Sequence, residues 1–401
     1  MTLGLIVRRS LRQHALSTAV TAGSIALAAG LMMAVWMVKE QSQATFTQFT
    51  GGFDAVLGAR SSKLQLVLNA VFHLEASPAN IAWKDVEEVQ RNPGVELAVP
   101  IAMGDNFRGY RIVGTMPEMF TKAEYAEGRK LAVRAPGRLF DPALREAVVG
   151  SFVARKLGLK RGDKFQPYHG LNFEESHQHD EEYVVVGVLE PSNTPADRVL
   201  WIPLEGVQKM DGHATETATE VSAVLVKLRT PLAGRALEQA YNKKAERLTF
   251  AWPIGATMAE LFGKIGWFDR VLALVAALVA VVAAGSVLAS IYNSMNERRR
   301  QIAILRALGA RRSTVAATVV LEAVAISVIG VVAGYAVYGA ILAVTARIIR
   351  AQTGIVLDAL AWHPVLVWAP LALVAMGALA GLLPAWKAYR TEVAEHLAPT
   401  Q

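Results

Sequence analysis

The amino-acid sequence predicts a membrane protein that is mainly α, with four transmembrane helices and a large α+β extracytoplasmic domain inserted between helices 1 and 2. Of its 401 residues, 53% are hydrophobic and 19% are charged, and the mean hydropathy is +0.31. Such a chain is too apolar for an ordinary soluble protein and too charged to lie entirely in a membrane. Long apolar runs and one long polar stretch account for this mixture.

The first apolar run covers residues 15–38 and is long enough to cross a hydrocarbon core of about 30 Å. It follows Arg8, Arg9 and Arg12, so a cleavable signal peptide is the alternative interpretation. The run is longer than the apolar core of a typical signal peptide, which favours an uncleaved first helix.

Three further runs have the length and apolarity of membrane spans, and the polar stretch after the first run is large enough to bury its own core. The predicted order is a cytoplasmic segment (1–14), helix 1 (15–38), the extracytoplasmic domain (39–267), helix 2 (268–292), a cytoplasmic connection (293–313), helix 3 (314–345), an outer connection (346–364), helix 4 (365–386) and a cytoplasmic tail (387–401).

The cations beside the apolar runs predict the orientation, because cytoplasmic segments carry an excess of Lys and Arg. These cations are Arg8, Arg9, Arg12, Arg298, Arg299, Arg300, Arg306, Arg311, Arg312, Lys387 and Arg390. They place both termini and the connection 293–313 in the cytoplasm, although Arg347 and Arg350 lie on the predicted outer side. Membrane orientation therefore explains the net charge of +7, and no nucleic-acid partner is expected.

The stretch 39–267 alternates between strand and helix patterns, which predicts an α+β domain. Strands are predicted at 95–101, 110–114, 183–189, 199–202 and 221–228, and helices at 61–72, 80–90, 151–157 and 231–247. Gly158 is a predicted helix end, and Gly51, Gly52 and Gly58 are predicted turns that open the domain. The sequence has no cysteine and no Gly-x-Ser-x-Gly motif, so neither a catalytic thiol nor a hydrolase is expected.

The connection between helices 2 and 3 is strongly amphipathic. Apolar Ile302, Leu305 and Leu308 recur at helical spacing, whereas arginines, among them Arg306, form a cationic face. Gly309 is a predicted helix stop. A short helix held between two spans would transmit a displacement into the membrane. The alternative interpretation is that the arginines only fix the topology and contact anionic lipid head groups.

The order of residues in this connection resembles the coupling segment of the FtsX-like permeases, the MacB and LolCDE type (type VII) of ABC transporter. The residues that match the family signature are Glu297, Arg298, Arg299, Ile302, Ile304, Leu305, Arg306, Ala307, Leu308, Gly309 and Ala310. The sequence departs from it mildly at Gln301 and Ala303. The layout of the spans, Glu322 in helix 3 and the closing stretch 383–397 are also similar to the family.

The resemblance implies the permease subunit of an ABC transporter complex in the bacterial inner membrane, which couples ATP hydrolysis by a separate ATPase subunit to movements of its extracytoplasmic domain. The expected outcome is export or extraction of a lipoprotein, peptide or small molecule. The implied ATPase-coupling residues are Glu297, Arg298, Arg299, Arg300, Ile302, Leu305, Arg306, Leu308 and Gly309. The alternative is a non-transport transmembrane regulator of a cell-wall hydrolase.

The resemblance also implies partners: an ABC ATPase subunit and a second permease copy, as a homodimer or a heterodimer. A periplasmic adaptor or lipoprotein is a further candidate, and the lipid bilayer surrounds the spans. The sequence has no Gly-x-x-x-x-Gly-Lys-Ser/Thr loop, and the stretch 1–14 is too short for a nucleotide domain. ATP and Mg²⁺ are therefore expected in the partner, and no enzyme activity is expected of this chain.

A histidine-rich stretch in the outer domain is a candidate metal site. His169, His177, His179 and Asp180 offer the nitrogen and oxygen ligands that zinc prefers. This stretch adds a role in zinc or other metal handling as a third functional hypothesis. A solvated acidic hairpin, or a loop that binds substrate or a partner, remains the alternative because the spacing is not diagnostic.

Overall fold

The computed structural model describes residues 3–170, 178–210, 219–244, 247–297, 303–304, 306–307, 309–354, 356–358 and 361–390. The chain divides into two compact units. The membrane unit comprises Met1–Gln41, Gly266–Arg347 and Asp358–Gln401, and the outer domain comprises Ser42–Ile265 and Ile348–Leu357.

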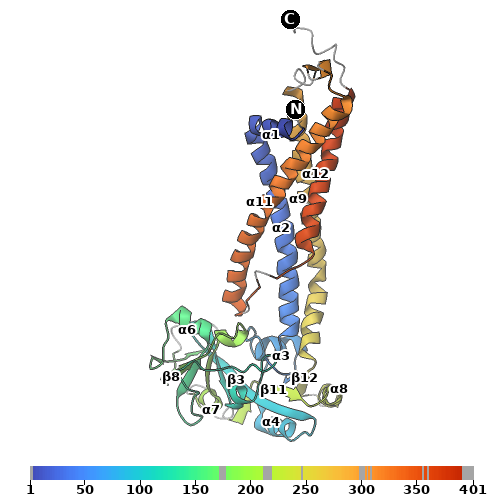
Figure 1. Ribbon diagram of the computed structural model, residues 1–401. Helices are drawn as coiled ribbons and strands as arrows, with labels where there is room; N and C mark the ends of the chain where they lie inside the picture. The colour runs from blue at the N-terminus through green and yellow to red at the C-terminus, as the bar shows by residue number, and fades with distance from the viewer. Residues whose placement is uncertain are drawn as a thin grey trace. The chain divides into compact units, whose positions relative to one another are not determined.

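Among the described residues, four helices are long and apolar enough to cross a membrane, which confirms the predicted fold class together with the mixed domain that follows the first of them. They are α2 (Ala15–Gln48), α9 (Ile254–Glu297), α11 (Arg312–Thr353) and α12 (Val365–Arg390) (Figure 1). A shorter amphipathic helix, α1 (Leu3–Gln13), precedes them. The helices α2, α9 and α11 extend past the predicted apolar runs because helical hydrogen bonding does not require apolar side chains.

Small residues hold the membrane unit together. A Cβ atom on Gly330 would lie 2.6 Å from Ile25 Cβ, and one on Gly334 would lie 2.7 Å from Ala29 Cβ, so α11 lies very close to α2. Gly381 of α12 approaches Ala323 of α11 in the same way. Close backbone approach through small residues is the usual packing of helices in lipid.

The outer domain is built on a mixed sheet with the strand order β12-β1-β11-β3-β4-β9-β5-β8-β6, and β7 pairs with β3. The strands are β1 (Ala55–Ala59), β3 (Val95–Phe107), β4 (Tyr110–Thr115), β5 (Glu146–Val149), β6 (Lys164–Phe165), β7 (Tyr168–His169), β8 (Tyr183–Val188), β9 (Leu200–Pro203), β11 (Ala223–Leu228) and β12 (Leu248–Ala251). A separate pair joins β2 (Ile81–Ala82) to β10 (Glu220–Val221). Most neighbouring strands in the sheet are antiparallel, but the pairs β4–β9 and β5–β8 are parallel.

Shorter helices and turns complete the domain. They are α3 (Lys63–Ala70), α4 (Trp83–Gln90), α5 (Glu118–Thr121), α6 (Ser151–Leu157), α7 (Leu204–Gln208), α8 (Pro231–Gln239), the 3-10 turn η1 (Pro195–Arg198) and the π turn η3 (Ala240–Lys244).

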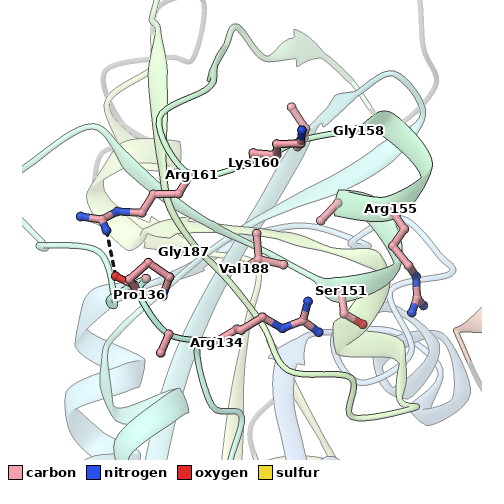
Figure 2. A pocket seen from close by; sticks show the side chains of 13 residues that line it. Arg134, Pro136, Ser151, Arg155, Gly158, Lys160, Arg161, Gly187 and Val188 are labelled. Carbon is pink, nitrogen blue, oxygen red and sulfur yellow. Dashed lines mark hydrogen bonds between the residues drawn. The ribbon is translucent and has the colours of Figure 1, made fainter.

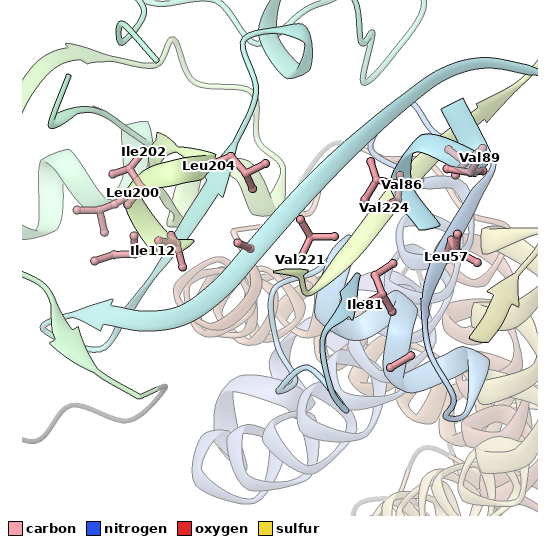
Figure 3. Packing of buried hydrophobic residues seen from close by; sticks show 14 of the residues in the cluster. Leu57, Ile81, Val86, Val89, Ile112, Leu200, Ile202, Leu204, Val221 and Val224 are labelled. Atoms are coloured by element: carbon pink, nitrogen blue, oxygen red, sulfur yellow. The ribbon is translucent and has the colours of Figure 1, made fainter. Parts of the chain in front are cut away.

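Both faces of the sheet are buried. Along β9, Leu200 and Ile202 point into one hydrophobic cluster while Trp201 points into the other, as side chains alternate along a strand. Figure 3 shows the first cluster, in which Val86 and Val89 of α4 pack with Leu57 of β1 and Val224 of β11. The second cluster includes Leu66 of α3.

Several sequence predictions for this domain are corrected. Gly51 and Gly52 do form a turn, with φ of +67° and +90°, but Gly58 lies within β1. A Cβ atom on Gly58 would lie 2.4 Å from Leu66 Cδ2, so the glycine allows α3 to approach the sheet. The predicted helix 231–247 ends at Gln239 and continues as η3, and Asn242 of that turn hydrogen-bonds the backbone of Phe250 in β12.

Candidate functional sites

The connection between α9 and α11 holds the predicted coupling residues. Of these, Arg298, Arg299, Arg300, Ile302, Leu305 and Leu308 lie outside the described residues. Glu297 is the last residue of α9, and Arg306 lies in a short helical stretch. Gly309 has φ of +97°, which favours glycine, and its amide donates to the Arg306 carbonyl at 3.0 Å. Gly309 therefore forms the turn between that stretch and α11.

Cation–aromatic contacts lie close to this connection in the membrane unit. Lys387 Nζ of α12 lies 4.4 Å from the ring centroid of Tyr292 in α9 and donates to its hydroxyl at 2.7 Å. Arg312 of α11 lies 6.0 Å from the ring centroid of Tyr389 in α12. These pairs join α12 to the end of α9 and to the start of α11. The sequence analysis missed these pairs. Tyrosines and cations near the ends of apolar helices are a known signal of the membrane–water interface, and could have indicated them.

Glu322 lies within α11, where an acid is costly unless it is paired. It is buried and accepts a hydrogen bond from the hydroxyl of Ser10 in α1, which is also buried. The amphipathic helix α1 is thereby attached to α11.

Two histidines of the histidine-rich stretch, His169 and His179, lie around a carboxylate that sequence reasoning missed. Asp105, near the end of β3, is fully buried and stands directly opposite His169 of β7. Because residues opposite each other in an antiparallel pair share a face, the His169 ring reaches the carboxylate, with 3.5 Å between Nδ1 and Oδ1. His179 approaches the same oxygen, with 3.1 Å between Nε2 and Oδ1.

The backbone around the cluster fixes these positions. The His179 amide donates to the Pro167 carbonyl at 2.9 Å, and Gln178 bridges to Tyr168. Asn106, beside Asp105, donates from Nδ2 to the Gly170 carbonyl at 2.8 Å, where the chain turns with φ of +83°. Three separate segments of the chain are therefore held together.

The other predicted ligands are placed differently. His177 lies outside the described residues, and Asp180 is exposed, with its backbone carbonyl accepting a hydrogen bond from Gln166. A charged residue at position 105 was the available signal, but the predicted strand ended at residue 101. The structure extends β3 to Phe107.

Burial and nearby charges shift the pKa values of two side chains in separate parts of the outer domain, Tyr183 and His73. Burial raises the pKa of Tyr183 strongly, Arg145 opposes the rise, and the carboxylates of Glu181 and Asp105 add to it. Burial also lowers the pKa of His73 to about 4, and the positive charges of Arg111 and Arg198 contribute. His73 contacts the edge of Trp201, with 5.6 Å between ring centroids, and is neutral at pH 7.

A basic recess of about 470 Å³ also lies in the outer domain, and Figure 2 shows it. Its cationic lining residues are Arg134, Arg155, Lys160 and Arg161. Two of these cations already interact with other groups of the protein. Arg161 donates a hydrogen bond to the Pro136 carbonyl at 2.9 Å, and Arg134 forms an ion pair with the Glu190 carboxylate at 3.6 Å. Anionic groups are the ligands that this lining favours.

In the described part of the chain, four helices of membrane-spanning length and a large mixed domain after the first are typical of a multi-pass membrane protein. Residues 18–243 match the family model of the MacB-like periplasmic core domain, and residues 273–393 match that of the FtsX-like permease C-terminal region. The chain belongs to the FtsX-like, MacB-type family of ABC transporter permeases. The resemblance found in the sequence is thereby confirmed, and the family indicates the bacterial inner membrane.

Solved structures similar to the chain include two outer regions of transporters. One is the periplasmic region of MacB from Actinobacillus actinomycetemcomitans, with 11% identity over 54% of this chain and 94% of that one and a TM-score of 0.37. The other is the extracellular domain of the noncanonic ABC-type transporter YknZ from Gram-positive bacteria, with 18% identity over 49% and 99% and a TM-score of 0.29. The search of curated protein sequences returned no match.

Proposed function

We propose that the chain couples ATP hydrolysis by a separate ATPase subunit to movement of its outer domain, driving export or extraction of a lipoprotein, peptide or small molecule. Both termini and the connection between α9 and α11 lie in the cytoplasm in this proposal. The observation that carries it is helix continuity: the helices that flank the connection also supply residues to the core of the outer domain.

Helix α9 is the main element of this argument. It has 44 residues in one uninterrupted helix. Its first turns contribute Ile254 and Met258 to the outer-domain core, and its later turns contribute Ala283 and Ile291 to the core of the membrane unit. Its last residue, Glu297, begins the coupling signature.

The ends of α2 and α11 are also part of the outer-domain core. Phe46 of α2 packs on Phe72, with 5.1 Å between ring centroids, and on Phe262 of α9 at 6.1 Å. Ile349 of α11 packs against the same cluster, and the Gln352 carbonyl accepts a hydrogen bond from Arg198. A helix transmits displacement along its axis, so three helices provide a mechanical route to the domain.

Charge reversal in the connection tests the proposal. The variant carries Arg298→Glu, Arg299→Glu and Arg306→Glu, and the matched control carries Arg155→Glu and Lys160→Glu in the outer domain. We expect the connection variant to lose co-purification with a candidate ATPase subunit and to lose stimulated ATP hydrolysis by that subunit. The control should keep both. Retention of both by the connection variant would refute the coupling role.

A second permease copy is part of the same proposal, and α9 is its expected interface. Only 22% of its apolar span is buried, against 50% for α2, 44% for α11 and 28% for α12. Leu274, Leu278 and Val281 are each at least 57% exposed, whereas Ala283 is 2% exposed. In a two-fold dimer, residues near the axis meet their own copies.

Single cysteines test this interface cleanly because the chain has none of its own. Leu274→Cys, Leu278→Cys and Val281→Cys should give disulfide-linked dimers in membranes, and Ala283→Cys should not. Equal cross-linking at all four positions, or none at the three exposed ones, would exclude α9 as the interface.

A further inference from the structure

We propose that Asp105, His169 and His179 bind a divalent transition-metal ion of the zinc class on the outer domain. This inference is independent of the coupling proposal, because it concerns a site formed by the outer domain alone. One ligand atom from each residue lies within 4.8 Å of the other two.

The distances suit a tetrahedral zinc ion. Bonds of about 2.0–2.1 Å at tetrahedral angles place neighbouring ligand atoms about 3.3 Å apart. The distances from the imidazole nitrogens to Asp105 Oδ1, 3.1 and 3.5 Å, lie on either side of this value. The two imidazole nitrogens lie within 4.8 Å of each other, so movement of the side chains alone would bring the three ligand atoms around one ion.

The chemistry of the donor set points to the same class of ion. Two imidazole nitrogens with one carboxylate oxygen suit zinc and its neighbours, whereas magnesium and calcium prefer oxygen ligands alone. Three protein ligands leave one tetrahedral position for water or another ligand. An open position for water is consistent with the exposure of the ligands. The side chain of His169 is 51% exposed, while those of His179 and Asp105 are 6% and 0% exposed.

The surrounding structure holds the ligands in place. Phe107, two residues after Asp105, packs on Phe165 with 5.0 Å between ring centroids, and Phe165 stacks on Tyr183 at 5.9 Å. The ligands come from β3, from β7 and from the segment that leads into β8. A bound ion would therefore cross-link three parts of the chain and stabilise the folded domain.

The first test measures Zn²⁺ binding to the full chain in detergent, purified with a tag that contains no histidine and stripped with a chelator. Competition with a chelating indicator should give one strong site per chain. His169→Ala, His179→Ala and Asp105→Asn should each weaken it by at least about 100-fold, since even changes behind the ligands cost 10- to 100-fold. Asp180→Asn, an exposed carboxylate beside His179, is the matched control and should bind normally.

The second test separates loss of a ligand from loss of the fold. Zn²⁺ should raise the unfolding temperature of the wild type and of Asp180→Asn but not that of His169→Ala. His169 is half-exposed, so this variant should keep the wild-type circular dichroism. Wild-type affinity in His169→Ala and His179→Ala, or an equal loss in Asp180→Asn, would overturn the proposal. Failure of the wild type to bind one Zn²⁺ tightly would do the same.

Discussion

The outer domain and the membrane unit are both closely packed, but in different ways. Large side chains fill the core of the outer domain, whereas small residues bring the helices of the membrane unit together. In the outer domain, Trp201, Tyr183 and Phe250 are almost completely buried. In the membrane unit, Gly330, Gly334 and Gly381 allow the helices to approach closely. The methionines Met33 and Met37 are buried there, but large residues such as Val332 and Leu371 are exposed.

The difference follows from the solvent of each unit. In water, burial of large apolar surfaces drives folding. In lipid, the surroundings are as apolar as the side chains, so helices gain more from close approach of their backbones. The two units should therefore be damaged by opposite substitutions, from large to small in the outer domain and from small to large in the membrane unit.

Truncation in the outer-domain core should have the largest effect. Trp201→Ala removes a fully buried ring whose Nε1 donates to the Ala196 carbonyl at 3.2 Å, and should lower the free energy of unfolding by about 3–5 kcal/mol. Leu232→Ala, at a side chain that is 77% exposed, is the control and should change it little. Denaturant unfolding followed by proteolysis of the outer domain measures both. Equal losses in the two variants would contradict this packing.

Acid should weaken the outer domain through His73. The pKa of His73 is lowered from 6.5 to about 4 in the folded state, so between these values the unfolded chain binds a proton that the folded chain does not. The contribution of neutral His73 to the free energy of unfolding is complete above about pH 6.5. It falls by about 1.4 kcal/mol per pH unit as the pH drops toward 4. In His73→Asn, which suits the left-handed φ of +55°, this part of the slope should disappear. An unchanged slope in pH-dependent unfolding would assign the effect to other groups.

Enlargement of a small residue should have a smaller effect, confined to the membrane unit. Gly334→Leu places a side chain against Ala29 and should lower the unfolding free energy by about 1–3 kcal/mol. Gly339→Leu is the matched control on the same helix, since no atom lies within 4 Å of a Cβ atom there. Thermal unfolding in mild detergent compares them. If both variants matched the wild type, close approach of α2 and α11 would not be what holds this unit together.

Much of the architecture could be predicted because it depends on local patterns. Apolar runs predicted the four membrane helices, and β-branched alternation predicted β3, β4, β8 and β9. Gly158 was predicted to end a helix and does so with φ of +71°. The predicted strand 221–228 is divided at Ser222, whose hydroxyl accepts a hydrogen bond from the Met103 amide, a contact that no local pattern indicates.

The sequence by itself determined the four apolar helices, the α+β character of the outer domain and the family, since each depends on hydropathy or on the order of neighbouring residues. The tertiary structure alone decided which residues meet. Asp105 joins His179 across 74 positions of the chain, and α9 reaches the cores of both units. Strand pairing and helix packing create such contacts between distant segments, so periodicity and composition do not reveal them.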